Sequence, residues 1–74
     1  MENRVMMQFM ECFGIPADIV VDDLEYASIP QWDSVAHMSL IVCLEDEFDI
    51  MIETDDVIDM SSFKKAKEIV NKYL

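Results

Sequence analysis

Apolar residues recur at helical spacing at the start of the chain, and these positions are Val5, Met6, Phe9 and Phe13. They form one stripe on a helical wheel, which predicts a helix from Glu2 to Phe13. Gly14 can end this helix as its C-cap, and Pro16 cannot continue it. The helical pattern then breaks down from residue 15 to residue 32, which indicates a long loop. A loop of this length should have its own packing or a function, and the apolar residues expected to pack against the core are Ile19, Val20, Leu24 and Ile29.

The second predicted helix, from Ser34 to Phe48, has two apolar faces. Either Asp33 or Ser34 can cap its start by accepting backbone N–H groups. One face is an ordinary core stripe of Leu40, Ile41, Leu44 and Phe48. The roughly opposite face holds Val35, Met38 and Val42, with Glu45 and Asp46 beside them. An apolar centre with a charged rim is typical of a docking surface. The alternative is that both faces are buried because the long loop packs over one of them.

Two further helices are predicted in the last third of the chain. A short one is expected from Asp55 to Asp59 with Thr54 as its N-cap, and a longer one from Ser62 to Tyr73 capped by Ser61. The buried stripe of the last helix is expected to hold Phe63, Ala66, Ile69, Val70 and Tyr73. The whole pattern predicts an all-α fold: a small four-helix bundle of three main helices and one short third helix, with a long first loop.

Length and composition support this interpretation and limit the function. The 74 residues are sufficient for a single domain, residues 1–74, and leave little material for a walled catalytic pocket. A hydrophobic fraction of 53% argues against disorder. One Gly and two Pro provide few tight turns, so a fold of many β-strands is disfavoured.

The charge is strongly negative, with 16 Asp and Glu against 5 Lys and Arg and a formal net charge of −11. Such a surface repels nucleic acid and anionic membranes, because both attract proteins through cationic side chains. The expected partners are proteins with basic patches, although solubility alone is an alternative explanation of the charge. We expect a monomer without membrane insertion.

The cysteines and the single histidine suggest no metal or disulfide chemistry. Cys12 and Cys43 lie in apolar runs, where a thiol behaves as a small hydrophobic group. No secretory signal or membrane-spanning run is evident, so free thiols in a reducing cytoplasm are expected. His37 has no ligands at a convincing zinc spacing and is expected to pack at the base of the second helix. The acidic pairs lack the central Gly of a calcium loop, so no metal site is predicted.

One local pattern suggests a function. Trp32-Asp33-Ser34-Val35 is followed, fourteen residues after Ser34, by Phe48 within Leu44-Glu45-Asp46-Glu47-Phe48-Asp49-Ile50. This resembles the acyl carrier protein family, the phosphopantetheine-binding carriers of fatty-acid, polyketide and related pathways. In that family an Asp-Ser-Leu motif opens the second helix and an acidic run ending in Phe closes it. The resemblance covers most of the chain, with the expected helices and loop in the family's order and proportions.

The resemblance implies that Ser34 carries covalent 4′-phosphopantetheine, transferred from coenzyme A by a phosphopantetheinyl transferase that contacts Asp33. The thiol of this arm would hold an acyl group as a thioester, so the chain would need no catalytic residues and would not be an enzyme. A serine at a helix start suits this role, because the N-terminal N–H groups and the helix dipole favour a phosphate. Without its surroundings, Ser34 would be interpreted as a plain N-cap.

The resemblance also implies two further sets of residues. The expected partner enzymes are acyl ligases, synthases or acyltransferases with basic surfaces. The positions that face them are Val35, Met38, Val42, Glu45, Asp46 and Glu47. Positions that line the interior, where some family members shelter an acyl chain, are Leu44, Phe48, Ile52 and Met60. Val35 replaces the family's usual Leu. Ala36, His37 and Ser39 are not acidic, so the negative patch beside Ser34 is thinner and a specialised biosynthetic pathway is favoured.

Three other functions compete with the acyl carrier. An aminoacyl or peptidyl carrier would use the same arm on Ser34. An unmodified, acidic helical interaction module would dock partners through Val35, Met38 and Val42, and Ser34→Ala would leave its function intact. A small enzyme would need a pocket of polar groups that the sequence does not supply.

Overall fold

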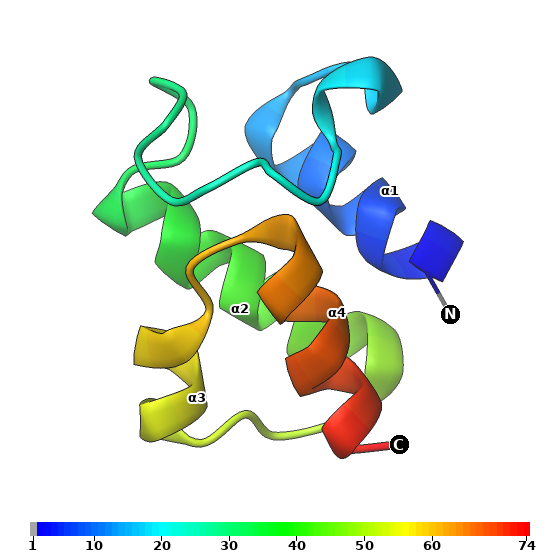
Figure 1. Ribbon diagram of the computed structural model, residues 1–74. Helices are drawn as coiled ribbons and strands as arrows, with labels where there is room; N and C mark the ends of the chain where they lie inside the picture. Colours follow the sequence, from blue (N-terminus) through cyan, green and yellow to red (C-terminus); the bar gives the residue numbers. More distant parts are fainter. Residues whose placement is uncertain (1) are drawn as a thin grey trace.

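The fold is all-helical in the part of the chain that the computed structural model describes, residues 2–74. The helices are α1 (Glu2–Phe13), α2 (Ser34–Phe48), α3 (Thr54–Asp59) and α4 (Phe63–Lys72), with a 3-10 turn at Ala17–Ile19 (Figure 1). The predicted all-α class and the bounds of the first two helices are confirmed. The end of α1 and the start of α2 have the local signals expected of them. Gly14 has a φ of 66° directly after α1, and Asp33 rather than Ser34 caps α2.

The starts of α3 and α4 were each predicted incorrectly by one residue. Thr54 is the first residue of α3, and the carbonyl of Glu53 accepts the first helical hydrogen bonds, from the N–H groups of Asp56 and Val57. The N-cap of α4 is Ser62, whose hydroxyl accepts a hydrogen bond from the Lys65 N–H at 3.0 Å. Ser61 lies one residue too early to cap α4, because Ser62 is itself extended and occupies the N-cap position.

The extended segment around Ser62 pairs with the first loop. The Ser61 carbonyl accepts a hydrogen bond from Tyr26 N–H, and Phe63 N–H donates to the Leu24 carbonyl, both at 2.9 Å. These two bonds flank a single antiparallel bridge between Glu25 and Ser62. The bridge holds Ser62 in an extended conformation, so the helix begins only at Phe63.

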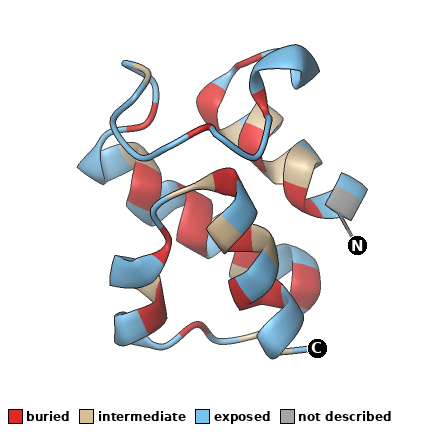
Figure 2. Ribbon diagram, in the orientation of Figure 1, coloured by how far each residue is buried: buried red, intermediate tan, exposed pale blue. Residues whose placement is uncertain are grey.

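The core is built from α1, α2, α4 and the segments that connect them (Figure 2). Trp32 belongs to this core and has no exposed surface. Its ring is 5.2 Å from the Phe9 ring and 5.4 Å from the Phe13 ring, centroid to centroid. Phe63 completes the aromatic cluster at 5.1 Å from Phe9. Such offset and edge-on pairs add stability beyond the area they bury.

The first loop packs on this core as predicted, with one exception. Val20 and Leu24 are buried and Ile29 is partly buried, whereas Ile19 is 38% exposed. Ile19 ends a 3-10 turn that has no buried residues, and Val20 directly after it faces the core instead. Tyr73, predicted in the buried stripe of α4, is the C-cap of this helix and only partly buried. The loop is tied to α4 by an ion pair of Lys67 with Asp22, 2.7 Å between Nζ and Oδ1.

Candidate functional site

Ser34 is the first residue of α2 and is exposed. The preceding residue, Asp33, caps the helix: its Oδ1 accepts a hydrogen bond from Ala36 N–H at 2.8 Å. Because the cap is supplied by Asp33, the Ser34 hydroxyl is not needed for it. No hydrogen bond to this hydroxyl is found within residues 2–74. A free hydroxyl at the start of a 15-residue helix lies where backbone N–H groups and the helix dipole favour a phosphate.

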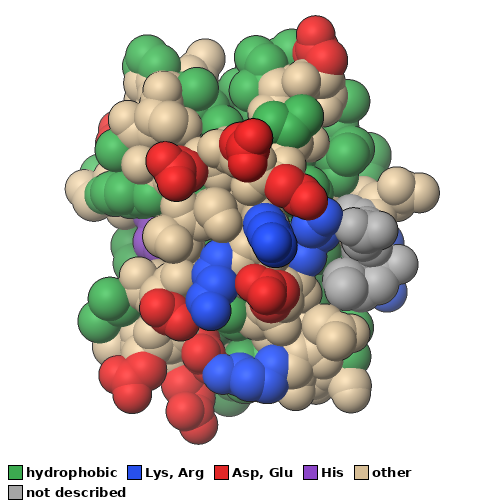
Figure 3. Space-filling model, in the orientation of Figure 1, with side chains coloured by type: hydrophobic (Ala, Val, Ile, Leu, Met, Phe, Trp, Pro, Cys, Tyr) green, Lys and Arg blue, Asp and Glu red, His purple; other side chains and the backbone are tan. Residues whose placement is uncertain are grey.

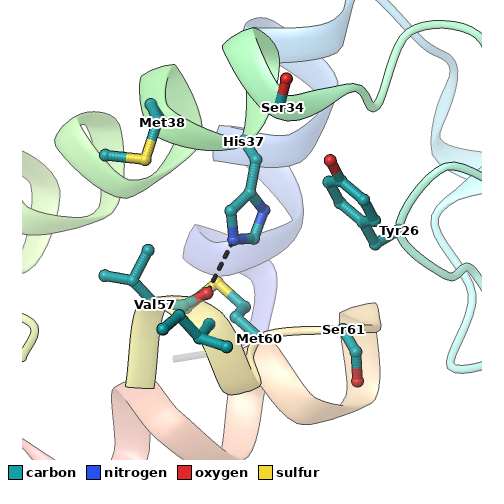
Figure 4. Close-up of a pocket in the computed structure, with 8 residues that line it drawn as sticks. Tyr26, Ser34, His37, Met38, Val57, Met60 and Ser61 are labelled. Atoms are coloured by element: carbon teal, nitrogen blue, oxygen red, sulfur yellow. Dashed lines mark hydrogen bonds between the residues drawn. The ribbon is translucent and has the colours of Figure 1, made fainter. Parts of the chain in front are cut away.

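A groove of about 360 Å³ lies next to Ser34. It runs between α2, α3 and the first loop, and the residues that line it are Tyr26, Ser34, His37, Met38, Val57, Ile58, Met60 and Ser61. Figure 4 shows the His37 ring projecting from α2 toward α3, with Tyr26 on one side and Met38 on the other. The lining is mostly apolar, with polar groups at its edges, which is typical of a site for a small organic group.

His37 holds the walls of this groove together. Its Nδ1 accepts a hydrogen bond from Trp32 Nε1 at 3.0 Å, and its Nε2 is 2.8 Å from the Val57 carbonyl oxygen. An indole N–H can only donate and a carbonyl can only accept, so the two partners require the neutral ring with its hydrogen on Nε2. The imidazole thereby connects the loop before α2 to α3, and its packing at the base of α2 agrees with the prediction.

The second apolar face of α2 is exposed, so the first loop does not cover it. Val35, Met38 and Val42 are 75%, 55% and 61% exposed. Two more exposed side chains, Met51 and Ile58, extend this face, at 84% and 77%. Ile58 lines the groove together with Met38, and Met51 lines a shallow hollow together with Val42. These five residues are referred to below as the docking surface, since apolar groups this exposed and this contiguous mark binding sites.

The acidic end of α2 does not act as one patch. Glu45 is partly buried and its Oε2 accepts a hydrogen bond from Ile52 N–H at 2.9 Å. Glu47 is paired with Arg4 of α1, 2.8 Å between Oε2 and Nε. Asp46 is exposed, lines the hollow beside Val42, and has no ion pair within the described residues. Of the three predicted acidic contacts, Asp46 is therefore the carboxylate that remains available to a partner.

The Lys and Arg side chains all come from α1 and α4. Three of them pair with acidic residues of the other two helices: Arg4 with Glu47 of α2, and Lys65 and Lys72 with Asp59 and Asp56 of α3. Arg4 is on α1 and the four lysines are on α4, and residues 5–63 contain no Lys or Arg. Figure 3 shows these basic side chains gathered on the face formed by α1 and α4. The segments that carry the docking surface, α2, α3 and the residues between them, consequently contain no Lys or Arg of their own.

The predicted interior positions are all buried, but only one of them lines the groove. Leu44, Phe48 and Ile52 are part of the packed core. Met60 is also buried, and it lines the groove, whereas the other three do not. The groove instead uses Tyr26, Val57 and Ser61, which the sequence analysis did not select. Their spacing contains no signal for this role, since they come from three separate segments.

The short helix α3 is anchored at its start by a polar cluster. Asp56 accepts hydrogen bonds from Lys72 Nζ at 2.7 Å and from Tyr73 Oη at 2.5 Å. These contacts, first that of Lys72, lower the pKa of Asp56, and Asp56 in turn raises the pKa of Lys72 and of Tyr73. Tyr73 Oη also accepts a hydrogen bond from Glu53 N–H at 2.9 Å. Together with His37, this cluster fixes α3 as one wall of the groove.

A scan of the chain against models of known protein families gives no match. None of the helices within residues 2–74 combines the length and the apolar character needed to cross a bilayer. The assignment of a function therefore depends on the geometry around Ser34 and on the resemblance described above.

Proposed function

We propose that this chain is an acyl carrier protein with a 4′-phosphopantetheine group on Ser34. The observation that supports this most directly is the free, exposed hydroxyl of Ser34 at the start of α2, next to both the groove and the docking surface. In this proposal the helices form the small four-helix bundle of such carriers, with α3 as the short third helix and the first loop packed over one end.

The residues around Ser34 are compatible with the attachment. The Ser34 oxygen would attack the phosphate of coenzyme A bound to a transferase, forming a phosphodiester while the bond to the nucleotide phosphate breaks and the nucleotide leaves. Asp33 holds the helix start in place during this step through its bond to Ala36 N–H. The arm, once attached, supplies a terminal thiol that carries an acyl group as a thioester. The groove next to Ser34 offers an apolar surface on which the arm or its acyl group can rest.

The docking surface would receive the enzymes that load and use the carrier. These enzymes are a phosphopantetheinyl transferase and then acyl ligases, synthases or acyltransferases with basic surfaces around an apolar patch. The net charge of −11 attracts such surfaces from a distance. The absence of Lys and Arg from α2 and α3 directs this attraction to the side of the molecule where Ser34 lies. Few carboxylates lie directly beside Ser34, which favours partners from a specialised pathway.

The decisive test is the mass of the intact protein after incubation with coenzyme A and a broad-specificity phosphopantetheinyl transferase. We expect the wild-type chain to gain one phosphopantetheinyl group and Ser34→Ala to gain none. Ser39→Ala is a matched control, since Ser39 is another exposed serine of α2 and its loss should leave the modification intact. A folded wild-type chain that gains no mass, while a known carrier is modified in parallel, would contradict the proposal.

A second candidate function is an unmodified interaction module, and the exposed docking surface favours it independently of Ser34. In that case Ser34→Ala would bind partners as wild type does, whereas Met38→Glu would not. An aminoacyl or peptidyl carrier shares the arm and differs in its cargo, which the mass of the loaded protein isolated from its source would reveal.

A further inference from the structure

Two thiols face each other where α1 packs against α2. The Sγ atoms of Cys12 and Cys43 are 3.8 Å apart, and both residues are free and partly buried. A disulfide requires a separation of about 2.05 Å between the two sulfur atoms. Rotation of the two side chains, with a small shift of the helices, could bring the sulfur atoms to this distance. Nothing in the proposed carrier function uses either thiol.

The contact between the helices holds these thiols in register. α1 and α2 run antiparallel, since Arg4 near the start of α1 pairs with Glu47 near the end of α2, while Cys12 near the end of α1 meets Cys43. Between these two points, Phe9 of α1 and Leu44 of α2 are fully buried in the common core. A packed interface of this kind keeps the sulfur atoms close to each other for most of the time.

We propose that Cys12 and Cys43 form a reversible disulfide that links α1 to α2 when the chain meets a low-molecular-weight disulfide such as oxidised glutathione. One thiolate of the pair attacks the glutathione disulfide, and one glutathione leaves as its thiolate and takes up a proton. The second thiolate then attacks the mixed disulfide and releases the other glutathione. Two protein thiols are oxidised, one glutathione disulfide is reduced, and no other reactant is needed.

The surroundings of the two thiols indicate the order of these steps. Burial, together with the neighbouring Cys43 thiol, raises the pKa of Cys12 to about 11. Cys12 therefore stays protonated near neutral pH and is the poorer nucleophile. We assign the first attack to Cys43 and the second, which is intramolecular and therefore favoured by proximity, to Cys12.

The disulfide would close a covalent ring from residue 12 to residue 43. This ring contains the whole first loop, Trp32, Ser34 and most of α2, so it links two of the groove's walls, while the α3 wall lies outside it. A ring of this size restricts the unfolded chain, and we expect the oxidised protein to melt at least about 10 °C higher than the reduced one. Ser34 lies on a different side of α2 and should remain available.

The test is thiol trapping after equilibration with mixtures of reduced and oxidised glutathione. The Ser34→Ala chain is used beside wild type, so that no thiol of an arm can take part. After rapid alkylation, the intact mass separates three species: two alkylated thiols, a glutathione adduct, and an internal disulfide that takes up no alkyl group. Proteolysis then shows whether the link joins Cys12 to Cys43.

We expect the internal disulfide to become the main species as the oxidised share rises, and Cys12→Ser and Cys43→Ser to give only glutathione adducts. Glutathione adducts alone in wild type, two free thiols throughout, or a disulfide only between two chains would each overturn the proposal. These readings come from wild type and Ser34→Ala, so the proposal remains testable even if a cysteine variant fails to fold. They are also independent of whether Ser34 accepts an arm.

Discussion

Replacement of His37 by Phe provides the sharpest test of how the groove is held together. The phenyl ring has nearly the volume of the imidazole and can keep its contacts with Trp32 and Tyr26, whose rings are 6.1 Å and 5.4 Å away, centroid to centroid. It cannot make either hydrogen bond of His37. The buried Trp32 N–H then has no acceptor, and the Val57 carbonyl loses its donor.

The expected cost follows from these two losses. A buried donor left without a partner costs about 1–3 kcal/mol, and the partly exposed Val57 carbonyl, which water can reach, adds up to about 1 kcal/mol. His37→Phe should therefore lower the free energy of unfolding by about 1–4 kcal/mol. For a chain of this length the total stability is about 4–11 kcal/mol, so the loss is a large share of it. The melting temperature should fall by at least about 5 °C.

The assay is urea unfolding followed by far-UV circular dichroism, with four proteins in a double-mutant cycle: wild type, His37→Phe, Trp32→Phe and the double variant. In the double variant no indole N–H is left unpaired, so Trp32→Phe should cost at least about 1 kcal/mol less there than in wild type. Val35→Ala, an exposed position on the same helix, is the control and should change stability by no more than about 0.5 kcal/mol. Costs that simply add, or a loss below about 0.5 kcal/mol in His37→Phe, would refute the role assigned to His37.

Four further predictions concern charge. The lowered pKa of Asp56 means that its stabilising contribution is complete above about pH 5 and is lost as pH falls through that pKa. When the melting temperature is measured against pH, Asp56→Asn should reduce the decrease on the acid side. Asp55→Asn should leave that decrease unchanged. The raised pKa values of Lys72 and Tyr73 imply a contribution to stability that is intact below about pH 10 and lost above it. Tyr73→Phe should therefore reduce the fall in melting temperature on the alkaline side of the same measurement. Because crowded carboxylates repel one another, the melting temperature should rise between low and moderate salt, and a constant value would contradict this. Asp46→Asn should lower kcat/KM for modification by the transferase severalfold at low salt, with little effect on stability. Glu47→Gln should mainly lower stability, because it removes the ion pair with Arg4. Equal effects of both variants on kcat/KM would count against the role assigned to Asp46.

The helices could be predicted from the sequence because their signals are local. Gly14 and Pro16 end α1, and the polar residues before Val35 begin α2, within a few residues of the position they determine. The errors arose where a distant segment intervenes. Ser62 is extended because it pairs with Glu25 of the first loop, and no pattern around Ser61 or Ser62 reveals that partner.

The groove could not be predicted, because it depends on how far α3 lies from α2. That distance is set by His37 and the Val57 carbonyl, twenty residues apart, and by Asp56 with Lys72 and Tyr73. Periodicity indicates which face of each helix is apolar, but not which side chains of two helices meet. The sequence predicted that His37 packs at the base of α2, but it did not reveal the hydrogen-bond partners of the ring, Trp32 and the Val57 carbonyl.

The acidic end of α2 shows how a helix divides a run of like residues. Consecutive residues point about 100° apart, so Glu45, Asp46 and Glu47 cannot all face one partner. Glu45 turns to Ile52 N–H, Glu47 turns to Arg4, and Asp46 alone lies beside Val42. Glu45 and Glu47 thus stabilise the C-terminal end of α2, through contacts with the following loop and with α1. The attraction of a basic partner must then come mainly from the uneven distribution of charge over the whole chain, with every Lys and Arg on α1 and α4. Such attraction acts on the rate of association and weakens with salt, while the exposed apolar residues of the docking surface determine how long the complex lasts.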